Sequence, residues 1–387
     1  MSQTITKPNY GRSILSISSS ILNNYGLSSN YKTLKKLDKL LNKNYKNIVF
    51  LILDCMGVNI IENNLKDDSI IKNNILTTVT TVFPPTTAAA TTSFHSGLSP
   101  YESGWIGWMP YFKKYDKMIE MFSGKDFYTG EQVINEIEPS LEYKTIYQKI
   151  HEKNNDIRIH KLFPSFAENG SNTFEELCSK IKKACNNNDK NLISAYWDDP
   201  DYTIHRSGVS SQKVKEVLKD IDNNIKTLKE ELTDTLIIIS ADHGAVDVEE
   251  VFLNDIKEID ECLEKPLSIE ARFVSIFVKE GMKERFKEMF DKYFKDKYEY
   301  KLYTKEDFLN ENLLGKGKKH EMIDSYLGDY IFISNSHLAI RYSITGENEN
   351  KHVADHAGIT KDEMVVPVIT IKCNKKDWLN EDNRIWR

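Results

Sequence analysis

The sequence lacks the features of a disulfide-stabilised, membrane-spanning or nucleic-acid-binding protein. Its 387 residues include five cysteines, an odd number without CxxC spacing, which argues against a disulfide framework and a thiolate zinc site. No stretch reaches the roughly 18 apolar residues of a membrane span, and no basic segment followed by an apolar one opens the chain. The net charge of -6 provides no basic excess for a nucleic-acid polymer. We therefore expect a cytoplasmic protein without membrane contact, of undetermined oligomeric state.

From residue 47 onward, apolar runs alternate with amphipathic segments. The runs at 47–53, 191–197 and 235–240 are nearly continuous in apolar residues, as strands buried on both faces are. The segment that begins at Ser211 repeats apolar residues at spacings of three and four, which predicts a helix packed on a sheet. This alternation is typical of βαβ units. The predicted fold class is α/β, with a doubly wound, mainly parallel sheet.

The sequence changes character between residues 261 and 320. An apolar strand pattern is followed there by an amphipathic helix and a lysine-rich stretch, and apolar strand patterns resume at 329–335 and 338–344. We interpret 261–320 as a small inserted α+β subdomain that caps the main domain. The main domain then comprises 46–260 and 321–387, and residues 1–45 form an N-terminal arm packed on it.

Acidic residues stand just past three of the predicted strands. Asp54, Asp201 and Asp242 hold these positions, with His243 beside Asp242 and His205 four residues after Asp201. Because ligands of open α/β sheets bind at the carboxyl ends of the strands, these side chains are expected to converge. Aspartate and histidine together suit zinc or manganese. With His356, six such residues could hold two divalent ions, most simply Zn²⁺, with Mn²⁺ as the alternative.

Neighbouring residues compete for two of these positions. Asp198 and Asp199 are alternatives to Asp201, but only Asp201 has a histidine at i+4, on the same face of a helix. His352 and Asp355 are alternatives to His356.

A nucleophile candidate lies in the segment FPPTTAAATTS. Two prolines precede Thr86 and Thr87, either of which could open an alanine- and threonine-rich helix. The positive end of a helix favours a phosphate or an alkoxide. A bound divalent ion would lower the pKa of the hydroxyl further. Trp105 and Trp108 follow this segment, and we expect them in the core, with stacking on a substrate as the alternative.

Several motifs resemble the type I phosphodiesterase / nucleotide pyrophosphatase family of the alkaline phosphatase superfamily. They are Asp54 after the first strand, FPPTT followed by SGLSPYESGWIGW, and then DDPDYTIH, SADHG and HAGITKDEMVVPVI. The resemblance implies one metal on Asp54, Asp242 and His243 and a second on Asp201, His205 and His356. It also favours His356 over its neighbours and implies Thr87 as the nucleophile that bridges to the first metal, with Thr86 as the near rival.

The expected activity is metal-dependent cleavage of a small phosphodiester or nucleotide-type substrate. Three departures from the family pattern concern the substrate: Ala90 stands where related nucleotide pyrophosphatases place an asparagine, Ser103-Gly104 stands in place of the usual His-Gly, and Ala357 replaces a glycine. The alternatives are a phosphomonoesterase or phosphonate hydrolase, a phosphomutase or phosphotransferase, and a non-catalytic metal-binding protein.

Overall fold

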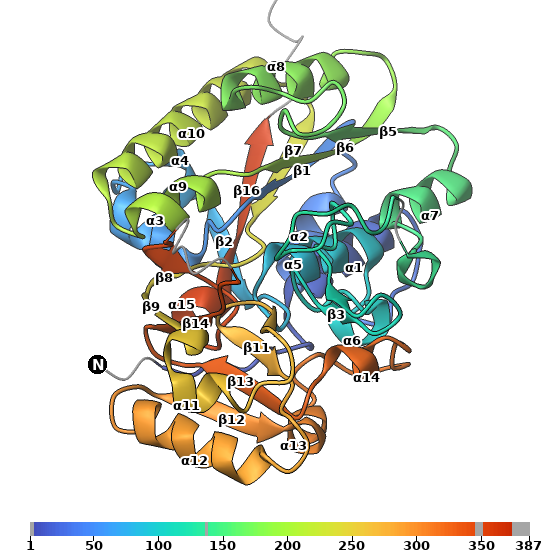
Figure 1. Ribbon diagram of the computed structural model, residues 1–387. Coiled ribbons are helices and arrows are strands. Elements are labelled where there is room, and N and C mark those ends of the chain that lie inside the picture. The colour runs from blue at the N-terminus through green and yellow to red at the C-terminus, as the bar shows by residue number, and fades with distance from the viewer. Residues whose placement is uncertain (1–3, 136–137, 345–350, 374–387) are drawn as a thin grey trace, which may run out of the picture.

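A six-stranded sheet lies at the centre of the larger part of the molecule (Figure 1). The computed structural model describes residues 4–135, 138–344 and 351–373, so the outer ends of the predicted arm and main domain lie outside the described residues. In order across the sheet, the strands are β2 (Ile75–Thr80), β16 (Val365–Cys373), β7 (Thr235–Ser240), β1 (Asn47–Leu53), β6 (Lys190–Trp197) and β5 (Ile157–Leu162). β16 is antiparallel to both its neighbours, and the other pairs are parallel.

Helices cover both faces of this sheet, which confirms the doubly wound α/β class (Figure 1). One group contains α3 (Val58–Asn64), α4 (Ile70–Asn73), α8 (Phe174–Cys185), α9 (Asp201–Ser207) and α10 (Gln212–Glu231). The other contains α1 (Ile14–Asn24), α2 (Lys35–Leu41), α5 (Thr87–Ser96) and α7 (Ile146–Lys153). The helix predicted from Ser211 is α10, and the Ser211 hydroxyl accepts a hydrogen bond from the Val214 amide at its start.

The three strands that precede the acidic residues are neighbours in the sheet. β1 lies between β7 and β6, parallel to both, with Leu53 opposite Trp197 and Ile52 opposite Ser240. All seven residues of β1 are buried, as expected for a strand covered on both faces. The ends of the three strands are therefore level, and Asp54, Asp201 and Asp242 leave the sheet at one edge.

A second, antiparallel sheet lies beside the first. Its strands, in order, are β10 (Ser268–Ile269), β11 (Phe273–Ile276), β13 (Tyr330–Ser334) and β12 (Tyr300–Thr304). Helix α12 (Lys283–Phe294) packs on it through Phe286, Phe290 and Phe294, which repeat every four residues. One strand of this sheet, β13, follows residue 320 in the chain, and the limits of 261–320 for the subdomain remain a prediction.

A buried ion pair joins the two parts. Arg272, next to β11, donates from Nε and Nη2 to the two carboxylate oxygens of Glu363 at 2.7 and 3.0 Å, and neither side chain is exposed. Glu363 lies in α15 (Lys361–Met364) and also accepts hydrogen bonds from the Gly358 amide and the Thr360 hydroxyl. The subdomain is thus fixed to the segment that follows His356.

Short elements complete the described chain: α6 (Pro100–Ser103), β3 (Tyr111–Phe112), β4 (Lys117–Met118), a 3₁₀ helix (Pro139–Leu141), β8 (Val246–Asp247), β9 (Glu249–Phe252), a second 3₁₀ helix (Leu253–Asp255), α11 (Lys257–Asp260), α13 (Lys305–Asn310), α14 (Ile323–Tyr326), β14 (Leu338–Arg341) and β15 (Ala354–Asp355). Among the helices that the structure describes, none combines the length and the apolar character needed to cross a membrane.

Candidate active site

The ends of two adjacent strands form a first cluster of potential metal ligands. Asp54 follows β1, and Asp242 and His243 follow β7. His243 Nε2 lies 3.3 Å from Asp54 Oδ1 and 3.7 Å from Asp242 Oδ2, and all three side chains are buried. A Cβ added at Gly57 would lie 2.7 Å from Gly244 Cα, so glycine is needed for the close approach of the loops after β1 and β7.

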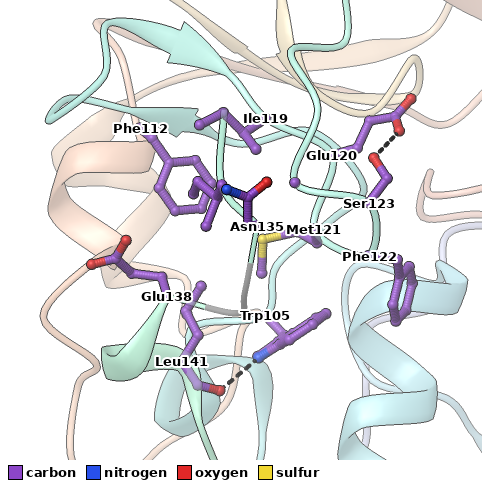
Figure 2. A pocket seen from close by; sticks show the side chains of 12 residues that line it. Trp105, Phe112, Ile119, Glu120, Met121, Phe122, Ser123, Asn135, Glu138 and Leu141 are labelled. Atoms are coloured by element: carbon purple, nitrogen blue, oxygen red, sulfur yellow. Dashed lines mark hydrogen bonds between the residues drawn. The ribbon is translucent and has the colours of Figure 1, made fainter. Parts of the chain in front are cut away.

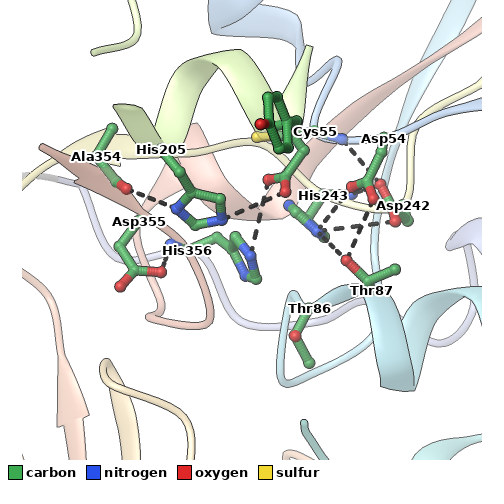
Figure 3. A network of polar contacts seen from close by, with 12 residues as sticks. Asp54, Cys55, Thr86, Thr87, His205, Asp242, His243, Ala354, Asp355 and His356 are labelled. Carbon is green, nitrogen blue, oxygen red and sulfur yellow. Dashed lines mark hydrogen bonds and ion pairs between the residues drawn. The ribbon is translucent and has the colours of Figure 1, made fainter. Parts of the chain in front are cut away.

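A second cluster adjoins the first (Figure 3). Asp201 begins α9, and His205 lies one turn later with Nε2 3.3 Å from Asp201 Oδ2. His356, which follows β15, places Nε2 3.8 Å from Asp201 Oδ1. The rings of His356 and His243 stack with their centroids 3.9 Å apart, so the clusters share a boundary.

The structure brings together the six residues predicted as ligands, in the two predicted groups, and it also places His352 and Asp355 within ligand range of His205. Each group can offer ligand atoms within 4.8 Å of one another: Asp54, Asp242 and His243 in one, and Asp201, His205 and His356 in the other. Their role as metal ligands remains a prediction.

The competing residues lie around the clusters. Asp355 accepts a hydrogen bond from Arg341 Nη2 at 2.6 Å, and His352 packs on the ring of His205. The Asp199 carboxylate accepts a hydrogen bond from the Thr203 amide within α9. Cys55 is buried between the clusters, within ligand range of Asp201 and His243, and burial raises the pKa of its thiol well above the usual value.

All three imidazoles are oriented by backbone carbonyls. The Nδ1 atoms of His205, His243 and His356 lie 2.8, 3.1 and 3.2 Å from the carbonyl oxygens of Ala354, Gly244 and Pro85. A carbonyl oxygen can only accept, so each Nδ1 carries the proton. In the neutral ring Nε2 then presents its lone pair toward the carboxylates, which is the arrangement found around metal-binding histidines.

The carboxylates contain buried oxygens that the protein does not satisfy. Asp242 Oδ1 accepts hydrogen bonds from the Cys55 and His243 amides at 3.0 Å, whereas its Oδ2 has no hydrogen-bond partner among the described residues. Asp54 Oδ1 and Asp201 Oδ1 are also buried without such a partner. Because buried polar atoms are normally paired, oxygens and imidazole nitrogens that converge in this way fit a pair of divalent cations.

The pKa values reflect the concentration of negative charge. Burial raises the pKa of Asp54 and Asp242 well above the usual range, and repulsion from Asp201 and Asp54, respectively, acts in the same direction. Burial opposes ionisation of Asp201 as well, but the charge of His205 outweighs it and keeps the pKa of Asp201 low. Against its own burial, His205 has its pKa raised to about 10 by Asp201. Cation binding at the second cluster therefore requires that His205 lose a proton.

The two candidate threonines have different partners. Thr87 is the first residue of α5, and its Oγ1 lies 3.4 Å from Asp54 Oδ2 and 3.3 Å from His243 Nε2. Thr86 is the N-cap residue, and its hydroxyl donates to Glu270 Oε1 at 2.6 Å. The Thr87 hydroxyl therefore points at the first cluster, and the Thr86 hydroxyl points away from it.

A cavity of about 440 Å³ opens over both threonines and the second cluster. Its lining includes Thr87, Asp201, His205 and His356 together with aromatic side chains, namely Trp108, Phe127, Tyr128, Phe252 and Tyr342. Trp108 and Phe127 are 36% and 37% exposed, whereas Trp105 is buried with Nε1 bonded to the Leu141 carbonyl. The sequence expectation is confirmed for Trp105 and wrong for Trp108.

A smaller cavity of about 190 Å³ is lined in part by Trp105 and Leu141 (Figure 2). Phe112, Met121 and Phe122 line it, and its acidic side chains are Glu120, which accepts from the Ser123 hydroxyl, and Glu138. It contains none of the clustered histidines and aspartates of the larger cavity.

Sequence reasoning missed three residues at the site. The Tyr196 hydroxyl, near the end of β6, donates to Asp54 Oδ2. Glu270 and Arg341 line the large cavity from the subdomain and from β14. The position of Tyr196 near a strand end was a usable signal, whereas nothing in the local sequence distinguishes Glu270 or Arg341.

Comparison with known proteins agrees with this geometry. Residues 48–358 match the family described as type I phosphodiesterase / nucleotide pyrophosphatase. The chain belongs to this family of phosphoester hydrolases. Ectonucleotide pyrophosphatase/phosphodiesterase family member 7 of Rattus norvegicus is 36% identical over 66 residues, which span 16% of this chain and only 15% of that protein.

Solved structures share the fold over most of their length. Murine ectonucleotide pyrophosphatase/phosphodiesterase 5 superposes with a TM-score of 0.61 at 16% identity, covering 85% of this chain and 90% of that one. The human protein superposes with a TM-score of 0.60 at 17% identity, with the same coverage of both chains. Phosphonoacetate hydrolase from Sinorhizobium meliloti superposes with a TM-score of 0.58 at 13% identity, covering 87% of this chain and 92% of that one. The family and the fold predicted from the sequence are thus confirmed.

Proposed function

We propose that this protein is a metal-dependent phosphodiesterase or nucleotide pyrophosphatase in which Thr87 is the nucleophile and two divalent ions bind the two clusters. The observation that carries the proposal is the position of the Thr87 hydroxyl, at the start of a helix and 3.4 Å from a carboxylate of the first cluster. A small phosphoester in the large cavity would lie against Thr87 and the second cluster.

The protein's own groups support a two-step displacement. Thr87 Oγ1 would form a bond to phosphorus as the bond to the leaving oxygen breaks, and water would then cleave the resulting phosphothreonine and regenerate the hydroxyl. Asp54 Oδ2 is within reach of the hydroxyl proton. The two ions, when bound, would neutralise phosphate charge and lower the pKa of the attacking hydroxyl and of water.

The first turn of α5 offers a substitute for the missing asparagine. Ala90 is fully buried in the core and does not line the cavity. The amides of the first helical turn have no intrahelical partner and are available to a phosphate oxygen. An inactive threonine-to-alanine variant of the murine relative was solved with AMP, which supports a threonine nucleophile and a nucleotide-type ligand here by analogy.

The donor set and the cysteines bear on the nature of the ions and on the cellular location. Three imidazoles among six donors favour Zn²⁺, and Mn²⁺ accepts the same donors. All five cysteines are free and buried, which is consistent with the cytoplasmic location inferred from the sequence. A phosphonate hydrolase on the same site is the second candidate, because phosphonoacetate hydrolase shares the fold.

The decisive experiment compares Thr87→Ala, Thr87→Ser and Thr86→Ala on a para-nitrophenyl ester of a nucleotide. Thr87→Ala is expected to lower kcat by about 10⁴-fold or more while both ions are retained in elemental analysis. Thr87→Ser keeps a hydroxyl and should retain activity and a phosphorylated or nucleotidylated residue detectable by mass spectrometry. Full activity in Thr87→Ala, or loss only in Thr86→Ala, would remove Thr87 from the mechanism.

A further inference from the structure

Glu270 enters the active-site cavity from the subdomain. It follows Ile269, whose φ of +83° is in the left-handed region that β-branched residues rarely adopt. Ile269 is held there by reciprocal backbone hydrogen bonds with Met109, at 3.0 and 3.2 Å. The turn that carries Glu270 is therefore fixed by the loop that carries Trp108, and a strained backbone of this kind often marks a functional position.

The carboxyl group of Glu270 is anchored through one oxygen. Oε1 accepts from the Thr86 hydroxyl at 2.6 Å and from the Trp108 amide at 2.8 Å. Oε2 has no hydrogen-bond partner among the described residues, although the side chain lines the cavity. Because Thr86 precedes Thr87 directly, this carboxyl group lies within about 10 Å of a phosphorus atom bound at Thr87. Glu270 is partly buried at the cavity wall, and salt screens partly buried charges much less than exposed ones.

Among the described residues that line the cavity, none provides an unpaired cation for a highly charged phosphate. Arg341 is the single arginine of this described lining, which contains no lysine. The Arg341 guanidinium already forms ion pairs with Glu250 and Asp355. The remaining basic side chains there are His205, His352 and His356. A substrate with a second negative charge on phosphorus would therefore meet a carboxylate without a matching positive partner beyond the ions themselves.

We propose that Glu270 is a specificity-determining residue that disfavours dianionic phosphomonoesters and phosphonates and so makes the site selective for monoanionic phosphodiesters. This inference rests on the proposed phosphoester hydrolysis and names its substrate class. The carboxylate acts by repulsion, which is one of the ways in which a site discriminates between otherwise similar ligands. Burial raises the pKa of Glu270 to about 7, so the test is performed in alkaline buffer, where the group is ionised.

The experiment measures kcat/KM for para-nitrophenyl methyl phosphate and para-nitrophenyl phosphate, which share a leaving group and differ in one charge. Glu270→Gln keeps the shape of the side chain and an amide oxygen that can accept the two anchoring hydrogen bonds. It is expected to raise the ratio of kcat/KM for the monoester to kcat/KM for the diester about tenfold. Glu270→Asp keeps the charge and should leave the ratio low. Glu288→Gln, on the exposed face of α12, makes the same charge change away from the cavity and should leave the ratio unchanged.

A binding measurement separates this inference from the proposed function. In the metal-loaded Thr87→Ala background, Glu270→Gln should strengthen the binding of inorganic phosphate more than that of dimethyl phosphate, as measured by thermal shift. If the wild-type protein cleaves neither ester, the proposed function fails and this binding contrast alone decides the role of Glu270. A wild-type preference for the monoester, or an equal ratio in wild type and Glu270→Gln, would overturn the inference.

Discussion

The two walls of the cavity are held in place by different kinds of structure. We call Asp54, Asp201, His205, Asp242, His243 and His356 the ligand wall, and Trp108, Phe127, Glu270, Arg341 and Tyr342 the facing wall. Within the ligand wall, Asp201, His205 and His356 line the cavity, and the other three form the first cluster next to Thr87. The ligand wall starts mainly at the level ends of β1, β6 and β7, whose register is fixed by buried pairing. The facing wall comes mainly from loops and from the subdomain. A rigid sheet edge suits the chemistry of the reaction, whereas loops can vary with the substrate.

Removal of single carboxylates from the ligand wall should have the largest effect. Asp242→Asn and Asp201→Asn are each expected to lose one ion in elemental analysis and to lower kcat/KM by about 10³-fold or more, because the ions stabilise the transition-state charge. Glu270→Gln on the facing wall should retain both ions. Loss of both ions in every ligand-wall variant would show that the two clusters are a single cooperative site.

Asp242→Asn is expected to have the opposite effect on stability in the absence of metal. Ionised Asp242 is buried and has a raised pKa, so at neutral pH it destabilises the metal-free fold. In the presence of a chelator, the free energy of unfolding of Asp242→Asn should therefore exceed that of the wild type by about 1–2 kcal/mol, as measured by denaturant titration. With zinc present, the order of the two stabilities should reverse. A chelated wild type that is more stable than Asp242→Asn would contradict the charge repulsion inferred for the first cluster.

The connection between the walls depends on the Arg272–Glu363 pair. Glu363→Ala leaves a buried guanidinium without its partner and is expected to lower the free energy of unfolding by about 3–5 kcal/mol, as measured by urea denaturation. The double variant Arg272→Met/Glu363→Met removes both charges and should recover part of the loss. An effect below about 1 kcal/mol for Glu363→Ala would mean that the subdomain is held by apolar contacts alone.

The same division explains what the sequence could predict. Asp54 and Asp242 follow long apolar runs, and parallel pairing of such runs leaves few alternatives for where their ends meet. Glu270 follows a two-residue strand, and its place in the cavity depends on tertiary contacts between Ile269 and Met109 that no local pattern encodes. The apolar run of β13 resembles a strand of either sheet, so its membership of the small sheet could not be read from residues 330–334.

The smallest expected effect concerns Ala357, directly after His356 on the ligand wall. Its φ is +80°, a conformation that favours glycine, and its amide donates to the Pro85 carbonyl at 2.9 Å. Ala357→Gly should therefore stabilise the chelated protein by about 0.5–1 kcal/mol in urea denaturation, because the strain removed exceeds the entropy that glycine adds to the unfolded chain. Ala354→Gly, three residues earlier in β15, provides the control and should destabilise by a similar amount. If both substitutions destabilise equally, Ala357 carries no strain, and the departure from the family glycine has no energetic consequence for the segment that holds His356.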